Sequence, residues 1–228
     1  MKTLSLTLLF CVSLLVAVPA LADTTVGLPA DTGTGNCYPF GCAYNGEYQQ
    51  VYTHGAFSGP ITITGLEFFN TQVNNGATAM NSGTWTISLS TTSADWTTLS
   101  NTFASNIGSN NTQVFSGNLA QSWTFGDTLT IHLSTPFTYN PSQGNLLMDV
   151  YATGTSASGG NIFFDASYNS VTGRVYHLGG TSGGVIETEG GFGLVTGFST
   201  SAVPIPGAIL LFAPGLAGLA AIRRRFKK

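Results

Sequence analysis

Four acidic residues lie in or beside segments that resemble β-strands, and paired carboxyl groups are the chemistry of glycoside hydrolysis. They are Glu47, Glu67, Asp149 and Asp165. A glycosidase holds two carboxyl groups roughly 5–10 Å apart, one as the acid and one as the base or nucleophile. Pairing of distant strands can bring any two of these residues together. A secreted glycoside hydrolase is therefore one hypothesis for this chain.

Other signals for catalysis are weak. The three histidines, His54, His132 and His177, are not spaced as a metal-binding pair, and no Gly-x-x-x-x-Gly-Lys phosphate loop is present. Arg174 is the only Lys or Arg between residues 23 and 203, so an enzyme for anionic sugars would have few groups with which to bind its substrate. We therefore expect a non-enzymatic protein.

Oxygen ligands for a metal are available in two places. The stretch "DTGTGN", Asp31 to Asn36, alternates oxygen donors with glycines, and Glu187 and Glu189 offer two further carboxylates. Calcium prefers such donors on loops, but the first stretch lacks the run of acids of an EF-hand. We expect no cofactor, with a structural calcium ion as the alternative.

Several aromatic side chains lie outside the obvious core alternation. They are Tyr38, Phe40, Tyr44, Tyr48 and Tyr52. Exposed aromatic rings on a sandwich face or loop often bind glycans, so a glycan-binding module is an alternative function. The same residues would also serve as a small satellite core around the turn between Cys37 and Cys42, and this is the interpretation we favour.

Threonine pairs two residues apart, in "ITIT", "TWT" and "TLT", raise the further possibility of ice binding. An ice-binding face needs a flat, regular threonine array, usually from repeats of fixed period, and no such period is present. Threonine favours strands and suits the outer face of a sheet in a chain with few charges. We therefore favour an ordinary outer face.

Alternation of apolar and hydroxyl side chains predicts several strands. In "TWTISLST", Trp85, Ile87 and Leu89 face one side, and the serines and threonines face the other. The segments "ITITGLEFF" and "TLTIHLS" repeat this pattern, whereas "NLLMDVYA" and "NIFFDASY" are apolar enough to be covered on both faces. The segments "RVYHLG" and "FGLVTGF" complete the predicted set.

One segment, residues 93–108, departs from this alternation. It places Trp96, Leu99 and Phe103 at helical spacing, after Ser93 and Asp95 as candidate N-caps. We expect one short helix here, at the edge of the sandwich. Because no long helices alternate with the strands, the predicted fold is all-β: an antiparallel, jelly-roll-like β-sandwich over residues 23–202.

Charge is sharply partitioned along the chain. All ten acids lie between Asp23 and Glu189, so residues 23–203 carry ten acids and one base, a formal charge of −9. A surface of this sign repels polyanions, which excludes nucleic acid as a main partner.

The first 22 residues have the layout of a secretory signal peptide. A basic start and an apolar run are followed by Ala20 and Ala22, which predicts cleavage before Asp23. Removal of this segment leaves Cys37 and Cys42 as the only cysteines, and in an exported protein such a pair most simply forms a disulfide.

The chain ends in an apolar run closed by basic residues. Residues 207–222 contain no charge and would span about 24 Å as a helix, enough to cross a membrane that thins locally. Basic residues at 223–228 would stay on the cytoplasmic side and leave the body outside. They are Arg223, Arg224, Arg225, Lys227 and Lys228. A permanent anchor is one interpretation of this pattern.

The tail also resembles the PEP-CTERM sorting signal of exopolysaccharide-producing bacteria. The resemblance covers residues 203–228: a tetrapeptide, the apolar span and the arginine cluster. The tetrapeptide consists of Val203, Pro204, Ile205 and Pro206. Ile205 stands where the family usually has an acidic residue, which is similar to the VPLPA-type variant. Similar tails also occur on certain ice-binding proteins, which does not make this body an ice binder.

This resemblance implies a route for the protein. It implies export, an inner-membrane intermediate, recognition by an exosortase (a membrane cysteine transpeptidase), and cleavage near the motif. The body also resembles a recurrent PEP-CTERM-associated β-domain of unassigned function, over most of residues 36–154. We therefore expect a structural or adhesive protein of the cell surface or the extracellular polysaccharide matrix.

Overall fold

The computed structural model describes residues 23–73, 78–178 and 185–201, without the side chains of 78–81, 178 and 185–187. The described residues form twelve strands and three short 3-10 turns. The strands are β1 (Thr24–Val26), β2 (Gly35–Asn36), β3 (Gly46–Tyr52), β4 (Ile61–Phe69), β5 (Thr78–Thr92), β6 (Thr112–Gly117), β7 (Gln121–Trp123), β8 (Thr128–Tyr139), β9 (Asn145–Ser158), β10 (Phe164–Leu178), β11 (Val185–Leu194) and β12 (Thr196–Ser201). The turns are η1 (His54–Ala56), η2 (Phe103–Ser105) and η3 (Pro141–Gln143).

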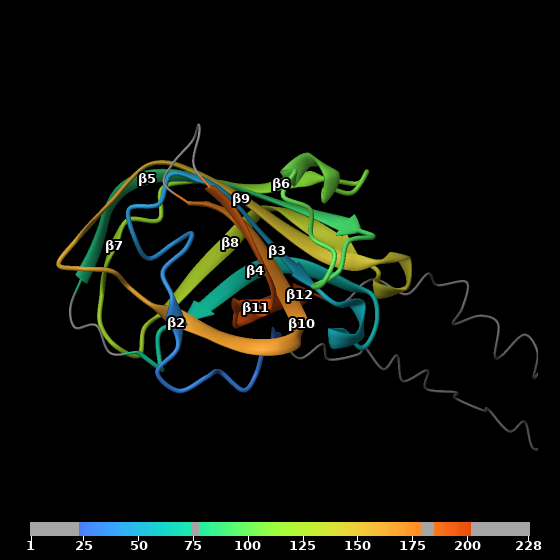
Figure 1. Cartoon of the computed structure of the whole chain (residues 1–228), viewed down its shortest axis with the longest axis horizontal. Coiled ribbons are helices and arrows are strands. Elements are labelled where there is room, and N and C mark those ends of the chain that lie inside the picture. The colour runs from blue at the N-terminus through green and yellow to red at the C-terminus, as the bar shows by residue number, and fades with distance from the viewer. Residues whose placement is uncertain (1–22, 74–77, 179–184, 202–228) are drawn as a thin grey trace, which may run out of the picture.

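The strands form two antiparallel sheets in a sandwich-like arrangement (Figure 1). The smaller sheet has the order β1-β12-β4-β8, and the larger has the order β11-β10-β3-β9-β5-β6. The short strands β2 and β7 pair with β10 and β5. All pairings between strands are antiparallel, so the all-β, antiparallel prediction is confirmed.

Alternation in the sequence predicts the buried faces correctly. Trp85, Ile87 and Leu89 of β5 are fully buried, and the alternate residues Thr84 and Thr86 are exposed or half-buried. The predicted two-sided burial of the segment 145–152 is also confirmed at its start, where consecutive residues of β9 are fully buried. Because successive side chains of a strand point to opposite faces of the sheet, the alternation in the sequence predicts which side chains are buried.

The core between the sheets is rich in aromatic side chains. Phe40, Phe68 and Phe164 pack together, with 4.6 Å between the ring centroids of Phe40 and Phe68. Cys37 and Cys42 form the predicted disulfide, with their Cα atoms 5.4 Å apart, and belong to this same core. The disulfide loop thereby carries Phe40 into the main core.

The predicted edge helix is wrong. Residues 93–108, which we call the strap, contain only the turn η2 and lie over the outer face of the larger sheet. Asp95 Oδ1 accepts both Thr97 N–H and Thr97 Oγ1–H, at 2.7 Å each, so the local amide is satisfied without a helix. Serines, threonines and asparagines favour such local bonds over helix interiors.

The strap packs on a second, smaller apolar cluster. Leu99 of the strap is buried against three residues of the outer face, Val51, Leu147 and Val175. Glycines permit this close approach, since a Cβ at Gly173 would lie 2.6 Å from Trp96 O and one at Gly190 would lie 2.7 Å from the same atom. The strap therefore sits in a notch that side chains at these positions would fill.

Both terminal segments lie outside the described residues. This applies to the predicted signal peptide (1–22), the sorting motif, the transmembrane helix (207–222) and the basic tail (223–228). Among the described residues, no helix has the length and apolar character needed to span a membrane.

Candidate functional site

Two of the four acids proposed for catalysis meet on the outer face of the larger sheet. Glu47 on β3 and Asp149 on β9 lie on neighbouring strands, with Gln49 directly opposite Asp149. Burial, followed by the charge of Asp149, raises the pKa of Glu47 to about 7. Burial also raises the pKa of Asp149. The two groups thus behave as a pair that holds a proton near neutral pH.

A glycosidase needs its two carboxyl groups on a cleft that admits the sugar. Neither Glu47 nor Asp149 lines either of the two cavities described below. Gln49 fills the adjacent space, because its Nε2 lies 3.5 Å from Glu47 Oε1 and donates to Phe103 O at 3.2 Å. The carboxyl pair therefore belongs to the contact between sheet and strap.

The other two acids lie apart from this pair. Glu67 accepts a hydrogen bond from Ser199 Oγ, at 3.0 Å, on the outer face of the smaller sheet. Asp165 is buried and accepts the backbone N–H groups of Thr71 and Gln72, at 2.8 and 3.0 Å, and the hydroxyl of Thr71 at 2.5 Å. Asp165 fixes the turn that follows β4.

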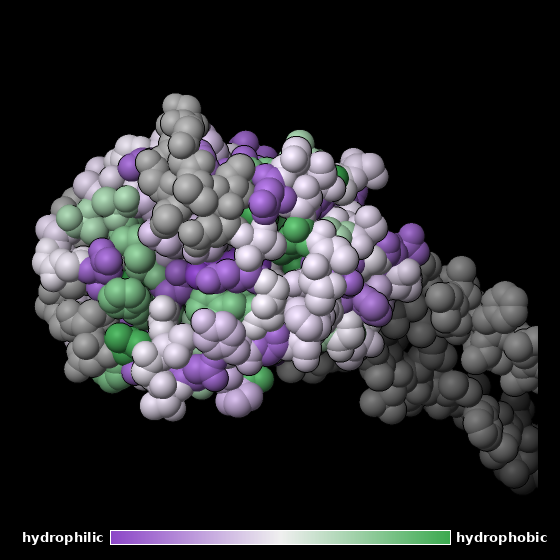
Figure 2. Space-filling view, viewed as in Figure 1, coloured by the Kyte–Doolittle hydropathy of each residue, from purple (hydrophilic) through white to green (hydrophobic). Residues whose placement is uncertain are grey.

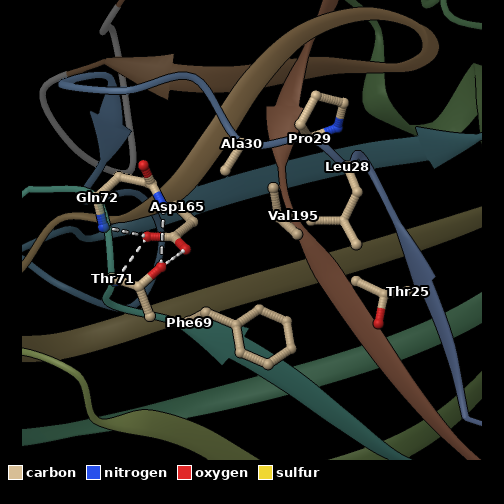
Figure 3. A pocket seen from close by; sticks show the side chains of 9 residues that line it. All are labelled: Thr25, Leu28, Pro29, Ala30, Phe69, Thr71, Gln72, Asp165 and Val195. Carbon is tan, nitrogen blue, oxygen red and sulfur yellow. Dashed lines mark hydrogen bonds between the residues drawn. The ribbon is translucent and has the colours of Figure 1, made fainter.

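A cavity of about 500 Å³ opens beside Asp165 (Figure 3). Segments distant in sequence form it: the chain after β1, the end of β4, the start of β10 and the link between β11 and β12. Its lining consists of Thr25, Leu28, Pro29, Ala30, Phe69, Thr71, Gln72, Asp165 and Val195. The lining combines apolar side chains with hydroxyl, amide and carboxylate groups.

Such a mixture can hold a sugar ring. Phe69 offers a half-buried ring and Leu28 a side chain that is 64% exposed, so the cavity has apolar surface at its mouth. Gln72 supplies an amide within the same lining, next to the Asp165 carboxylate, which already accepts hydrogen bonds from Thr71 and Gln72. Ligand sites commonly combine an apolar wall with a few polar groups that orient the ligand.

A second cavity, of about 290 Å³, lies at the opposite end of the smaller sheet. It is lined entirely by uncharged polar residues: Thr91, Ser109, Asn110, Thr138, Asn140 and Gln143. Thr138 of the second cavity pairs with Thr62 near the start of β4, whereas Phe69 of the first cavity is the last residue of β4. The smaller sheet therefore has a hollow at each end, one of mixed character and one entirely polar.

The aromatic side chains singled out from the sequence do not form an exposed platform. Phe40, Tyr44, Tyr48 and Tyr52 are buried in the main core, and Tyr38 is half-buried against it. They join the main core, so the expectation of a satellite core around the disulfide is also wrong. Tyr48 and Tyr52 lie on one face of β3, in phase with Tyr44 of the preceding turn, and the sequence interpretation missed this strand.

Other side chains carry the exposed aromatic surface. Tyr168 is 70% exposed, Tyr151 46% and Phe125 43%. Tyr151 lies on the same face of β9 as Leu147 and Asp149. The apolar character of residues 145–152 concealed this phase in the sequence.

Neither the histidines nor the proposed calcium ligands gather. His54 contacts Asn145 Oδ1, His132 is exposed on β8, and Asp31 accepts the backbone N–H of Tyr168 at 2.6 Å. Glu189 binds Arg174 at 2.5 Å, while the side chain of Glu187 lies outside the described residues. Within the described part of the chain, no three His, Cys, Asp or Glu residues are placed to hold a metal ion.

Arg174 is not available to bind an anion at the surface. Its side chain is buried, pairs with Glu189, and lies over the rings of Tyr176 and Phe192 at 4.6 and 4.4 Å. Cation–π contacts of this kind stabilise a desolvated guanidinium. The body therefore has no exposed strong base between residues 23 and 203.

The residues assigned to processing lie outside the described part of the chain. These are Ala20 and Ala22 at the signal cleavage site, and all residues of the sorting motif and basic tail. Asp23, the predicted first residue after cleavage, is exposed at the start of the described chain.

No family model, curated protein or solved structure matches the chain.

Proposed function

We propose that this chain is an exported, non-enzymatic protein with a structural or adhesive role at the cell surface or in an extracellular polysaccharide matrix. The cavity beside Asp165 is the observation that carries the adhesive role. Its apolar wall and its hydroxyl and amide groups suit a sugar unit. The proposed body is a jelly-roll-like sandwich.

The tail supports a route to that location. We propose that an exosortase recognises Val203, Pro204, Ile205 and Pro206 after the transmembrane segment has stopped in the inner membrane. The basic residues from Arg223 to Lys228 would keep the end of the chain on the cytoplasmic side. Cleavage near the motif would then release the body or attach it at the surface.

Charge narrows the class of polysaccharide. Residues 23–203 carry a formal charge of −9, and their single strong base is buried in an ion pair. A polyanionic sugar would be repelled, and no exposed arginine or lysine would compensate. Neutral polysaccharide is therefore the proposed ligand.

Co-sedimentation with insoluble neutral polysaccharide from the host matrix tests this role. Phe69→Ala removes the ring from the cavity and should weaken binding by at least tenfold. Tyr151→Ala removes a ring of 46% exposure from the opposite sheet and should leave binding unchanged. Equal binding by both variants, or none by the unmodified protein, would contradict the proposed contact.

A further inference from the structure

The strap is held to the larger sheet by a small polar network. Asn106 of the strap is 1% exposed, and its Nδ2 donates to Gln49 Oε1 at 2.9 Å and to Ser100 O at 2.9 Å. Its Oδ1 accepts the N–H of Ser100 at 2.8 Å. Gln49, fully buried, donates in turn to Phe103 O. A single glutamine of the sheet thus binds the strap at two residues.

Gln49 lies between the strap and the two acids. Its Nε2 donates to Phe103 O at 3.2 Å and lies 3.5 Å from Glu47 Oε1, and Asp149 is directly opposite it on β9. Asp149 Oδ1 is buried with no hydrogen-bond partner among the described residues. An ionised carboxylate accepts a hydrogen bond about twice as strong as a neutral carbonyl does. Ionisation of both acids therefore draws the amide of Gln49 away from the strap.

We propose that Glu47 and Asp149 share one proton that keeps the strap on the sheet, and that loss of this proton releases the strap. The apolar outer face formed by Val51, Leu147 and Val175 would then be uncovered. This inference goes beyond the proposed function, and it does not depend on polysaccharide binding.

Groups on the neighbouring strands and on the strap flank the pair. Other titratable groups around the pair are Tyr44, whose hydroxyl donates to Glu47 O, Tyr151, which pairs with Glu47 across β9, and His177, which follows Tyr176, the partner of Tyr48, on β10. Ser88 of β5, opposite Asp149, carries no charge. The only charged residue of the strap, Asp95, accepts the N–H of Thr97 near the start of the strap, away from the residues that contact Gln49. The pKa of Glu47, raised to about 7 by burial and by Asp149, agrees with this arrangement.

Hydrogen exchange of the strap amides on the full chain, corrected for the intrinsic effect of pH, tests the proposal. Between about pH 4.5 and pH 7, protection of residues 99–108 should fall by up to about tenfold per pH unit, the limit for one linked proton, and it should level off above neutrality. Glu47→Gln should make this protection independent of pH. Glu67→Gln, on the other sheet, is the matched control and should behave as the unmodified protein does.

Two results would overturn the proposal. One is strap protection that stays constant in the unmodified protein over this range. The other is a Glu47→Gln variant with the same pH response as the unmodified protein. If Glu47→Gln fails to fold, Asp149→Asn and the profile of the unmodified protein still decide the question.

Discussion

The strap covers the outer face of the larger sheet, whereas the outer face of the smaller sheet has exposed hydroxyl and histidine side chains along β8. On the larger sheet, Val51, Leu147 and Val175 face outward and the strap covers them. On the smaller sheet, the outward residues of β8, from Thr128 through Thr130 to His132, are exposed, and no strap covers them among the described residues. Figure 2, which views one face, shows pale and purple residues over most of it, with green ones gathered mainly on the left.

This difference shows two ways in which a chain with few charges can cover the outer face of a sheet. Hydroxyl side chains are enough where a face meets water directly, as on the smaller sheet. Where apolar residues face outward, a polar segment must cover them, and that segment needs its own anchors. Glycines and a buried amide network provide those anchors beneath the strap.

Removing a side chain under the strap should have the largest effect. Leu147→Ala deletes a fully buried side chain between sheet and strap, so the free energy of unfolding should fall by about 2–5 kcal/mol. Urea denaturation followed by circular dichroism measures this. A loss below about 0.5 kcal/mol would mean that the strap does not bury this face.

Filling the glycine notch should have the next largest effect. Gly173→Ala places a Cβ 2.6 Å from Trp96 O, and overpacking of this kind costs about 1–3 kcal/mol. Gly55→Ala is the control, since a Cβ there meets nothing within 4 Å. Thermal unfolding of the two variants should separate them, and equal midpoints would contradict the close approach of the strap.

Breaking the amide network should come third. Asn106→Ala leaves Gln49 Oε1 buried without its donor, which costs about 1–3 kcal/mol. Exchange of the strap amides should quicken, while exchange in β4 and β8 should not change. Uniform quickening in both sheets would show that Asn106 stabilises the whole fold instead.

The pH dependence of stability should be smaller and has a defined sign. Between about pH 4.5 and pH 7, folded Glu47 holds more proton than the unfolded chain, so its contribution makes stability fall as pH rises through this window. Glu47→Gln should flatten the fall in chemical denaturation. An unchanged slope in the variant would remove Glu47 as its cause.

Substitutions on the outer face of the smaller sheet should have the smallest effect on stability. Thr130→Ala touches an exposed hydroxyl of β8 and should change the free energy of unfolding by less than about 0.5 kcal/mol. Denaturation in parallel with Leu147→Ala gives the contrast directly. A comparable loss of unfolding free energy in both variants would contradict the claim that the strap buries only the outer face of the larger sheet.

Much of the fold could be predicted from alternation alone. The phase of β4, β5 and β8 follows from residues such as Ile63, Trp85 and Ile131, because a period of two fixes which face is buried. The strap could not be predicted, since Trp96, Leu99 and Phe103 have helical spacing but are placed by packing and by local turns. Local spacing cannot distinguish a helix from an irregular segment held by tertiary contacts.

The candidate sites were less accessible from sequence. Glu47 and Asp149 were named as acids near strands, but only the register of β3 with β9 brings them together. The cavity beside Asp165 is lined by segments that lie between residue 25 and residue 195, so no local sequence motif predicts it. Long-range strand pairing creates both sites.

The most direct test of the proposed export and sorting is intact-mass analysis of the protein recovered from its host, with membrane and medium fractions kept separate. We expect a chain that begins at Asp23 and ends near Pro204–Pro206. This cleaved form should disappear when the exosortase is deleted. A C-terminus through Lys228, found only in membranes, would contradict sorting and leave a permanently anchored protein.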